Sequence, residues 1–170
     1  MWNTESGRRV DEHVSEPSAP HVQELGHLVL YVSDLARSVD FYEHVLGWHR
    51  LPQVQGMPAA AFSGGRTHHE LLLIEVGPNA TPIPDGRRLG MYHFGLKVGD
   101  SDDELRAMLA RVRERPDLVR LVGATDHHVT HSLYVVDPDG NEIELYVDVP
   151  DADWRNDPSL LMKPGLPLHL

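Results

Sequence analysis

One short pattern occurs twice in this chain of 170 residues, and it limits the folds that are possible. Residues 26–34 read GHLVLYVSD and residues 92–100 read YHFGLKVGD, so a histidine and a terminal aspartate recur 66 positions apart, at 27 and 93 and at 34 and 100. In both copies an alternating, strand-like run is followed by a helical pattern and three further strand-like runs. The sequence therefore predicts two copies of one β-α-β-β-β module.

The first module is expected over residues 23–80. Its first strand turns His27 to the face opposite an apolar row, because side chains alternate along a strand. A helix follows and is expected to end at Gly47, since glycine readily adopts the left-handed conformation that closes helices. The strands expected in this module run over residues 23–32, 48–55, 59–62 and 69–76.

The second module is expected over residues 89–150, after a linker rich in Pro, Gly and Arg at 81–88. Ser101 and Glu104 form the Ser-x-x-Glu pattern of a capping box, which predicts the start of a helix. A tight turn is expected at 137–141, because Pro, Asp, Gly and Asn favour turn conformations. The strands expected in this module run over residues 89–98, 118–122, 130–136 and 141–147.

The two ends of the chain lie outside this repeat. Residues 1–22 are polar and show no periodicity, so we expect a flexible N-terminal tail. Residues 151–170 contain apolar side chains without a clear period, and we expect a C-terminal arm that packs along the domain or covers an opening. The domain between these ends is expected over residues 23–150.

The composition excludes several classes of partner. A net charge of −11 argues against nucleic acid or an anionic membrane surface as a partner. The absence of cysteine excludes disulfides and thiolate metal ligands. No apolar run reaches membrane-spanning length and no signal-peptide core is seen, so a cytoplasmic protein is expected. The 12 histidines include the pairs at 68–69 and 127–128, and imidazole is a common ligand for transition metals.

Three candidate metal ligands occupy one kind of strand face. His27 and His93 hold equivalent positions in the two modules, opposite the apolar rows. Glu144 takes the corresponding face of the last strand, where it alternates with apolar residues. One such histidine is readily explained as a core residue, but the repeated pair with a carboxylate is not. Two histidines and one carboxylate form the facial triad of non-haem Fe(II) sites, which leaves positions open on the metal.

Over about residues 23–150 the sequence resembles the vicinal oxygen chelate superfamily, and within it a short form of the type I extradiol catechol dioxygenases. The resemblance implies an α+β fold in which two βαβββ modules pair into a curved sheet that encloses a metal site. The family's metal ligands fall on His27, His93 and Glu144. The resemblance implies cleavage of a catechol-type diol with O₂ by Fe(II), with Mn(II), Ni(II) or Zn(II) as alternative metals. A homodimer is expected, because oligomers are common in this superfamily.

The resemblance also implies three catalytic residues. A family histidine falls on the pair His68-His69, of which His69 is the expected acid-base residue. The family tyrosine found ten residues before the ligand glutamate falls on Tyr134, whose hydroxyl can donate a hydrogen bond. Another family histidine falls on His127, and His128 stays open as an alternative because the spacing of this loop is not fixed.

Two other functions stay open at this point. A glyoxalase or a fosfomycin-resistance enzyme of the same superfamily is the first, and glyoxalase would use Glu70 as a fourth ligand. Only one of His69 and Glu70 can face the metal in a regular strand. A bleomycin-resistance protein, which binds a drug without a metal, is the second. Tyr134 and His127 favour the dioxygenase, because the glyoxalase pattern does not call for them.

The substrate is specified only as a class. A substituted catechol such as L-DOPA carries a charged arm and would need a cation at the rim of the cleft. The available cations are Arg66, Arg155 and Lys163.

Overall fold

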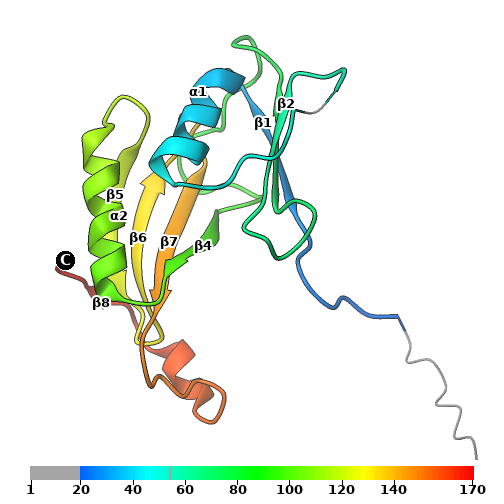
Figure 1. Cartoon of the computed structure of the whole chain (residues 1–170). Helices are drawn as coiled ribbons and strands as arrows, with labels where there is room; N and C mark the ends of the chain where they lie inside the picture. Colours follow the sequence, from blue (N-terminus) through cyan, green and yellow to red (C-terminus); the bar gives the residue numbers. More distant parts are fainter. Residues whose placement is uncertain (1–19, 54) are drawn as a thin grey trace, which may run out of the picture.

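The computed structural model describes residues 20–53 and 55–170, and it has the expected α+β fold with two sheets and few helices. Figure 1 shows the sheet of the first module on the right and the larger sheet of the second module on the left. Most of the expected N-terminal tail, residues 1–19, lies outside the described residues. No helix among the described residues is long and apolar enough to cross a membrane.

The first module forms a three-stranded sheet with the order β1-β3-β2. β1 runs parallel to β3, and β2 runs antiparallel to it. Of the strand expected at 48–55, the described residues 48–53 and 55 show one bridge, between Arg50 and Phe62. Pro52 lies in this stretch, and proline cannot donate to a strand ladder. The strands of this sheet are β1 (Leu28–Val32), β2 (Ala59–Phe62) and β3 (Leu71–Glu75).

The second module forms a sheet with the order β4-β7-β6-β5-β8. β4 runs parallel to β7 just as β1 runs parallel to β3, so the predicted repeat is present in the topology. The C-terminal arm contributes the short strand β8, which pairs with β5. The strands of this sheet are β4 (His93–Gly99), β5 (Arg120–Asp126), β6 (Thr130–Val136), β7 (Glu142–Asp148) and β8 (Leu166–Pro167).

The helices α1 and α2 both begin at a residue whose side chain caps the first turn. The Asp34 side chain accepts a hydrogen bond from the Arg37 backbone N–H. The Ser101 hydroxyl accepts from the Glu104 N–H, and the Glu104 carboxylate reaches back to accept from the Asp100 N–H at 2.8 Å, so the predicted Ser-x-x-Glu pattern does start the helix. The helices are α1 (Leu35–Val39), its π-helical continuation η1 (Asp40–Val45), α2 (Asp102–Glu114) and the 3₁₀ turn η2 (Pro158–Met162).

One apolar core joins the two modules. Leu30 of β1, Tyr42 of η1, Leu105 of α2 and Leu145 of β7 all belong to it and are buried. Removing these apolar surfaces from water is the main favourable contribution to folding. As the alternation predicted, the apolar rows of the strands face this core, whereas His27 lies on the exposed face of the first strand region.

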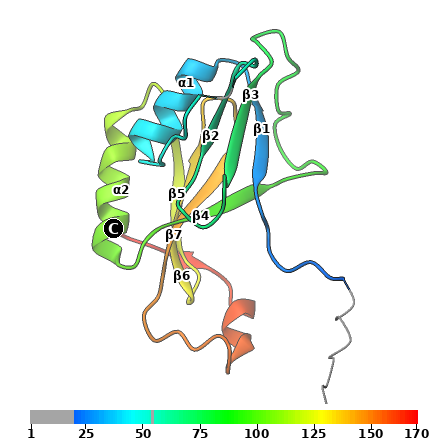
Figure 2. The same cartoon turned by 45° about the vertical axis from the view of Figure 1, so that its right-hand side comes forward.

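Polar contacts fasten the helices of the two modules to each other at the edge of this core. The Arg115 guanidinium lies 2.8 Å from the Asp40 carboxylate of η1. Arg111 of α2 donates to the His44 carbonyl at 2.7 Å. Figure 2 accordingly shows α1 and α2 next to each other, to the left of the strands. The modules are therefore joined through their helices, and the first strands β1 and β4 are edge strands of two separate sheets.

The predicted turn at 137–141 is built around a buried carboxylate. Asp137 accepts hydrogen bonds from the Tyr42 hydroxyl at 2.8 Å and from both the backbone N–H and the side-chain amide of Asn141. Burial raises the pKa of Asp137, although these hydrogen bonds oppose the rise. Since Tyr42 belongs to the first module, this carboxylate ties the turn of one module to the core of the other.

The variant Asp137→Ala should lower the free energy of unfolding by about 3 kcal/mol, because it leaves the buried Tyr42 hydroxyl and the Asn141 amide without their acceptor. Urea denaturation followed by circular dichroism measures this loss. Tyr42→Phe removes one hydrogen bond without stranding a second donor and should cost about 1 kcal/mol. An Asp137→Ala protein as stable as the wild type would contradict the role of Asp137 as the buried acceptor for Tyr42 and Asn141.

Candidate functional site

Four of the residues predicted for the site gather on the face of the larger sheet that points away from the core. The His93 Nε2 atom on β4 lies 3.4 Å from Glu144 Oε2 on β7. The Tyr134 hydroxyl on β6 is 2.8 Å from His127 Nε2 in a hydrogen bond, and that nitrogen is 4.0 Å from Glu144 Oε1. Strand register accounts for the cluster, because Tyr134 and Glu144 are direct cross-strand partners. We call these four residues the second half-site.

The environment of this half-site suits a polar ligand. The His93 Nδ1 atom is buried and has no hydrogen-bond partner among the described residues. A buried imidazole nitrogen without a hydrogen-bond partner has lost its contact with water and gained nothing in return. Apolar packing of the ring does not compensate for this cost. Burial, followed by the nearby Glu144 carboxylate, raises the pKa of Tyr134 well above its ordinary value. Tyr134 is therefore a neutral phenol that can donate a hydrogen bond.

The first module carries a separate group of three histidines. The rings of His27 and His69 have their centres 4.6 Å apart, and His68 Nδ1 is 2.6 Å from His69 Nδ1. Partial desolvation, followed by the neighbouring imidazoles His68 and His27, lowers the pKa of His69. His69 is therefore neutral near pH 7. We call these three residues the first half-site.

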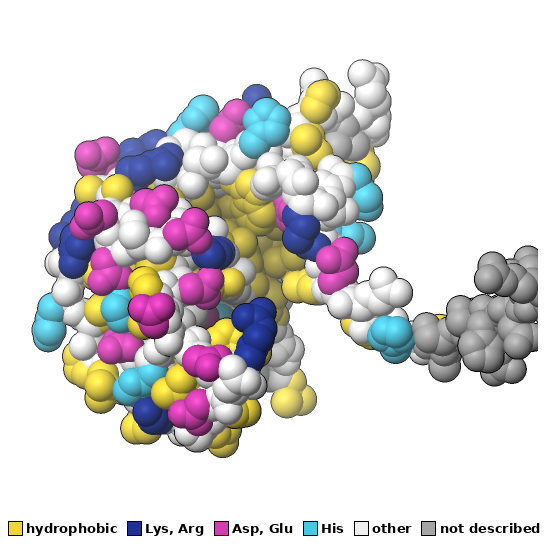
Figure 3. All heavy atoms as spheres, turned by 60° about the horizontal axis from the view of Figure 1, so that its bottom comes forward, with side chains coloured by type: hydrophobic (Ala, Val, Ile, Leu, Met, Phe, Trp, Pro, Cys, Tyr) yellow, Lys and Arg dark blue, Asp and Glu magenta, His cyan; other side chains and the backbone are white. Residues whose placement is uncertain are grey.

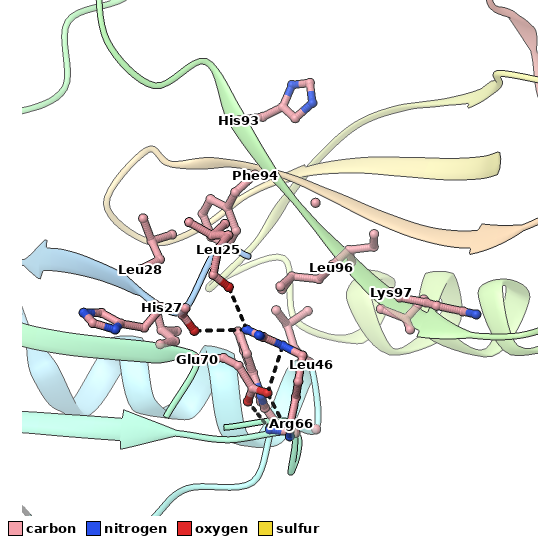
Figure 4. Close-up of a pocket in the computed structure, with 18 of the residues that line it drawn as sticks. Leu25, His27, Leu28, Leu46, Arg66, Glu70, His93, Phe94, Leu96 and Lys97 are labelled. Atoms are coloured by element: carbon pink, nitrogen blue, oxygen red, sulfur yellow. Dashed lines mark hydrogen bonds and ion pairs between the residues drawn. The ribbon is translucent and has the colours of Figure 1, made fainter. Parts of the chain in front are cut away.

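Within one chain the two half-sites are not gathered into one cluster of ligands, although His27 and His93 line the same cavity. Figure 4 shows the rings of His27 and His93 pointing in different directions, neither toward the other. Over residues 20–53 and 55–170, no group of three or more His, Asp or Glu side chains is gathered closely enough to hold a metal ion. His93 and Glu144 thus form a fitting pair of donors, while the third predicted ligand, His27, lies with the other group.

A cavity of about 940 Å³ separates the two edge strands β1 and β4. Seen from below, the molecule is hollowed, and hydrophobic side chains lie at the bottom of the hollow (Figure 3). The apolar lining comes from both modules and includes Leu28, Trp48, Phe94 and Leu96. This cavity extends the shared core toward the surface, and the carboxylate of Glu144 is not among its lining groups.

Glu70 anchors a loop of its own module. Its carboxylate accepts from the backbone N–H groups of Gly64 and Arg66, and the Arg66 guanidinium lies 3.7 Å away (Figure 4). Desolvation opposes ionisation here, but the hydrogen bonds from Gly64, Arg66 and Ser63 prevail and lower the pKa of Glu70. His69, not Glu70, is therefore the residue of this pair that contacts His27.

The turn that contains His127 and His128 sends their rings to different partners. His128 has a φ of +68°, and its N–H donates to Asp126 Oδ1 at 2.7 Å. Its ring lies 3.1 Å from the Pro164 carbonyl of the C-terminal arm, in hydrogen-bond contact. His127 alone reaches Tyr134. The arm therefore holds the turn that presents His127.

Two of the three cations suggested for a substrate arm already have partners. Arg66 lies 3.1 Å from Glu24 and also contacts Glu70. The Arg155 guanidinium stacks over the Trp154 ring at 4.4 Å. These contacts give both side chains a structural explanation.

Sequence reasoning did not single out Ser132. This buried serine on β6 donates to Glu144 Oε1 at 2.6 Å. The available signal was strand parity, which places Ser132 on the same face of β6 as Tyr134.

Comparison with known proteins identifies the family of this chain. A sequence model of the Glyoxalase/Bleomycin resistance protein/Dioxygenase superfamily matches residues 24–145. The chain belongs to this superfamily. A crystal structure of a glyoxalase/dioxygenase from Nostoc punctiforme has the same fold, with a TM-score of 0.62, 23% identity, and coverage of 80% of this chain and 99% of that one.

Similar proteins within the superfamily carry different activities in their names. A catechol-2,3-dioxygenase from Bacillus subtilis (strain 168) is 35% identical over 133 residues, which cover 78% of this chain and 44% of that protein. A lactoylglutathione lyase from Neisseria meningitidis is 30% identical over 123 residues, covering 70% of this chain and 86% of that protein. The chain thus spans less than half the length of the dioxygenase relative.

The variant Glu70→Gln should leave metal binding unchanged and lower stability by about 1–2 kcal/mol at pH 7, because it weakens the anchor of the 63–70 loop. The folded pKa of Glu70 is below its ordinary value of 4.5, so this stabilisation should be present above pH 4.5 and be lost as the pH falls further. Glu24→Gln, on the exposed side of Arg66, is the control and should change neither property. Reduced metal content in Glu70→Gln would make Glu70 a ligand, as in the glyoxalase alternative.

Proposed function

We propose that this protein is an Fe(II)-dependent extradiol dioxygenase that cleaves the ring of a catechol-type substrate. The observation that carries the proposal is the second half-site, where His93 and Glu144 lie beside the hydrogen-bonded pair of Tyr134 and His127. A glyoxalase reaction gives this tyrosine–histidine pair no role. The similarity to a catechol-2,3-dioxygenase supports the same assignment.

His27, His93 and Glu144 would hold the metal. Two neutral imidazoles and one carboxylate supply one negative charge and occupy one side of the ion, which is the donor set that suits non-haem Fe(II). When bound, Fe(II) supplies the redox chemistry by which O₂ reacts with the aromatic ring. Mn(II) is an alternative with the same donor preference, whereas Ni(II) or Zn(II) would favour the glyoxalase function.

The remaining residues handle protons and hydrogen bonds. Neutral His69 can accept a proton from a substrate hydroxyl and later return it as an acid. Tyr134 can donate its hydroxyl hydrogen to an oxygen of the substrate or of O₂. In the tautomer protonated at Nε2, His127 donates to the Tyr134 hydroxyl oxygen and leaves the hydroxyl hydrogen free for this role. In the overall reaction one ring C–C bond breaks and both atoms of O₂ enter the product.

The two half-sites would be brought together by a second copy of the chain. Their faces point out of the shared core, and the burial of that core opposes a rearrangement of the modules within one chain. Tyr31, which shares the strand face of His27 by parity, and Met91, two residues before His93, are exposed large apolar side chains. In a two-fold dimer the first half-site of each copy would cover the second half-site of its partner.

The substrate and the cell compartment are proposed on narrower grounds. A substituted catechol such as L-DOPA or 3,4-dihydroxyphenylacetate fits the function, and Lys163 of the C-terminal arm is the cation available for its charged group. A cytoplasmic location stays a prediction from the sequence. The domain bounds of 23–150, with modules at 23–80 and 89–150, are likewise proposed.

The proposed function is tested by anaerobic reconstitution with Fe(II), followed by catechol, 3,4-dihydroxyphenylacetate or L-DOPA in air. We expect a yellow ring-opened semialdehyde and the uptake of one O₂ for each diol consumed. His27→Ala, His93→Ala and Glu144→Ala should each lose bound iron. His69→Ala should retain iron and lose turnover by about 10²–10⁴-fold, as for a general acid-base residue.

Three results would redirect this assignment. Activity on a hemithioacetal with Ni(II) or Zn(II), without ring cleavage, would indicate a glyoxalase. Binding of a bleomycin-type drug with no retained metal would indicate a sequestering protein. Full iron occupancy in one of the three ligand variants would remove that residue from the ligand set.

The shared-site arrangement predicts complementation between inactive variants. Co-expressed His27→Ala and Glu144→Ala chains should regain about one quarter of wild-type activity and bound iron, because half of the dimers are mixed and each holds one intact site of two. Differently tagged chains, purified in tandem, isolate the mixed dimer. The matched control is His93→Ala with Glu144→Ala, which removes the same half-site from both chains and should regain nothing. No recovery in the first pair, or full activity in a monomer by ultracentrifugation, would place each site within one chain.

A further inference from the structure

Glu144 is held from one side by Ser132, a residue to which the proposed reaction assigns no role. Ser132 has no exposed surface. Its hydroxyl donates to Glu144 Oε1 at 2.6 Å. Hydrogen bonds from a hydroxyl to a carboxylate at this distance are among the strong ones, because the acceptor is charged.

The strand register places this serine where it can act on Glu144. Ser132 pairs with Tyr146 across β6 and β7, and Tyr134 pairs with Glu144. Ser132 is therefore a diagonal neighbour of Glu144 on the same sheet face.

The two oxygens of Glu144 have different partners. Oε1 accepts from Ser132 and lies 4.0 Å from His127 Nε2. Oε2 faces His93 Nε2 at 3.4 Å. The hydroxyl thus fixes the rotation of the carboxylate and leaves Oε2 toward the histidine with which it would share a cation.

The hydrogen bond is not explained by the needs of the serine alone. A buried hydroxyl requires an acceptor, but the Thr130 hydroxyl lies 3.3 Å from Ser132 Oγ and offers one. Ser132 instead reaches Glu144 at the shorter distance. We therefore interpret the hydrogen bond from Ser132 as one that orients the Glu144 carboxylate.

We propose that Ser132 is a positioning residue for a divalent cation at Glu144: by occupying Oε1 it presents Oε2, together with His93, as the metal-binding atoms. This inference rests on the proposed function, since it assumes a metal at Glu144. Residues that hold a ligating group in place typically contribute about 10- to 100-fold in metal affinity. We expect an effect of about this size for Ser132.

The test is an anaerobic titration of the full chain with Co(II), with a competing chelator to measure affinity and the visible spectrum to report coordination. Ser132→Ala should weaken Co(II) binding by about 10–100-fold. Ser132→Thr, which keeps the hydroxyl, should bind close to the wild-type level. Thr and Val have the same shape, so Ser132→Thr against Ser132→Val isolates the hydroxyl even if Ser132→Ala fails to fold.

The matched control is Ser38→Ala. Ser38 is equally buried and donates to a carboxylate oxygen of Asp139 at 3.2 Å, away from the second half-site. The Ser38→Ala variant should lower thermal stability, as Ser132→Ala does, but should leave Co(II) affinity unchanged. Wild-type affinity in Ser132→Ala, or equal weakening in both alanine variants, would overturn the inference alone. A wild-type protein that binds no Co(II), Fe(II) or Mn(II) would overturn the proposed function and this inference with it.

Discussion

Burial of the apolar strand faces against α1, η1 and α2 holds both modules in one core, and the placement of every candidate site residue follows from it. Because side chains alternate along a strand, turning one row into the core turns the other row out of it. His27, His93, Glu144 and Tyr134 all lie in outward rows. The helix contacts, such as Arg115 with Asp40, then fix how the two outward faces are oriented relative to each other.

The two half-sites differ in how their polar groups are satisfied. In the second, Glu144 is surrounded by potential donors, and the neutral Tyr134 is paired with His127. In the first, three imidazoles contact one another, and the carboxylate of the neighbouring Glu70 is occupied by its own loop. A second copy of the chain would supply each group with what it lacks, which is why dimerisation and metal binding belong to one proposal.

Membership in the superfamily limits the possible reactions of this protein but does not identify one of them. Its named members include a dioxygenase and a lactoylglutathione lyase at similar identity to this chain. A fold supports many reactions, and the reaction is decided by the groups at the site. Here the tyrosine–histidine pair beside Glu144 and the occupied Glu70 are the local features that favour ring cleavage over the glyoxalase reaction.

The sequence by itself determined the strand parity and the start of α2, because these depend on neighbours a few residues apart, and it showed the repeat because the same local pattern occurs twice. The 66-residue offset predicted two copies of one module, which the structure contains as the matching parallel pairs β1–β3 and β4–β7, and Ser101 with Glu104 marked the start of α2. The sequence did not reveal that the strand expected around Pro52 would form one bridge in the described residues. Nor did it reveal that the Ser132 hydroxyl would donate to Glu144. Only the tertiary structure decided which residues meet: His127 over His128, and His93 with Glu144 but without His27. Those outcomes depend on how two modules pack through their helices, which is set by contacts between residues far apart in the chain.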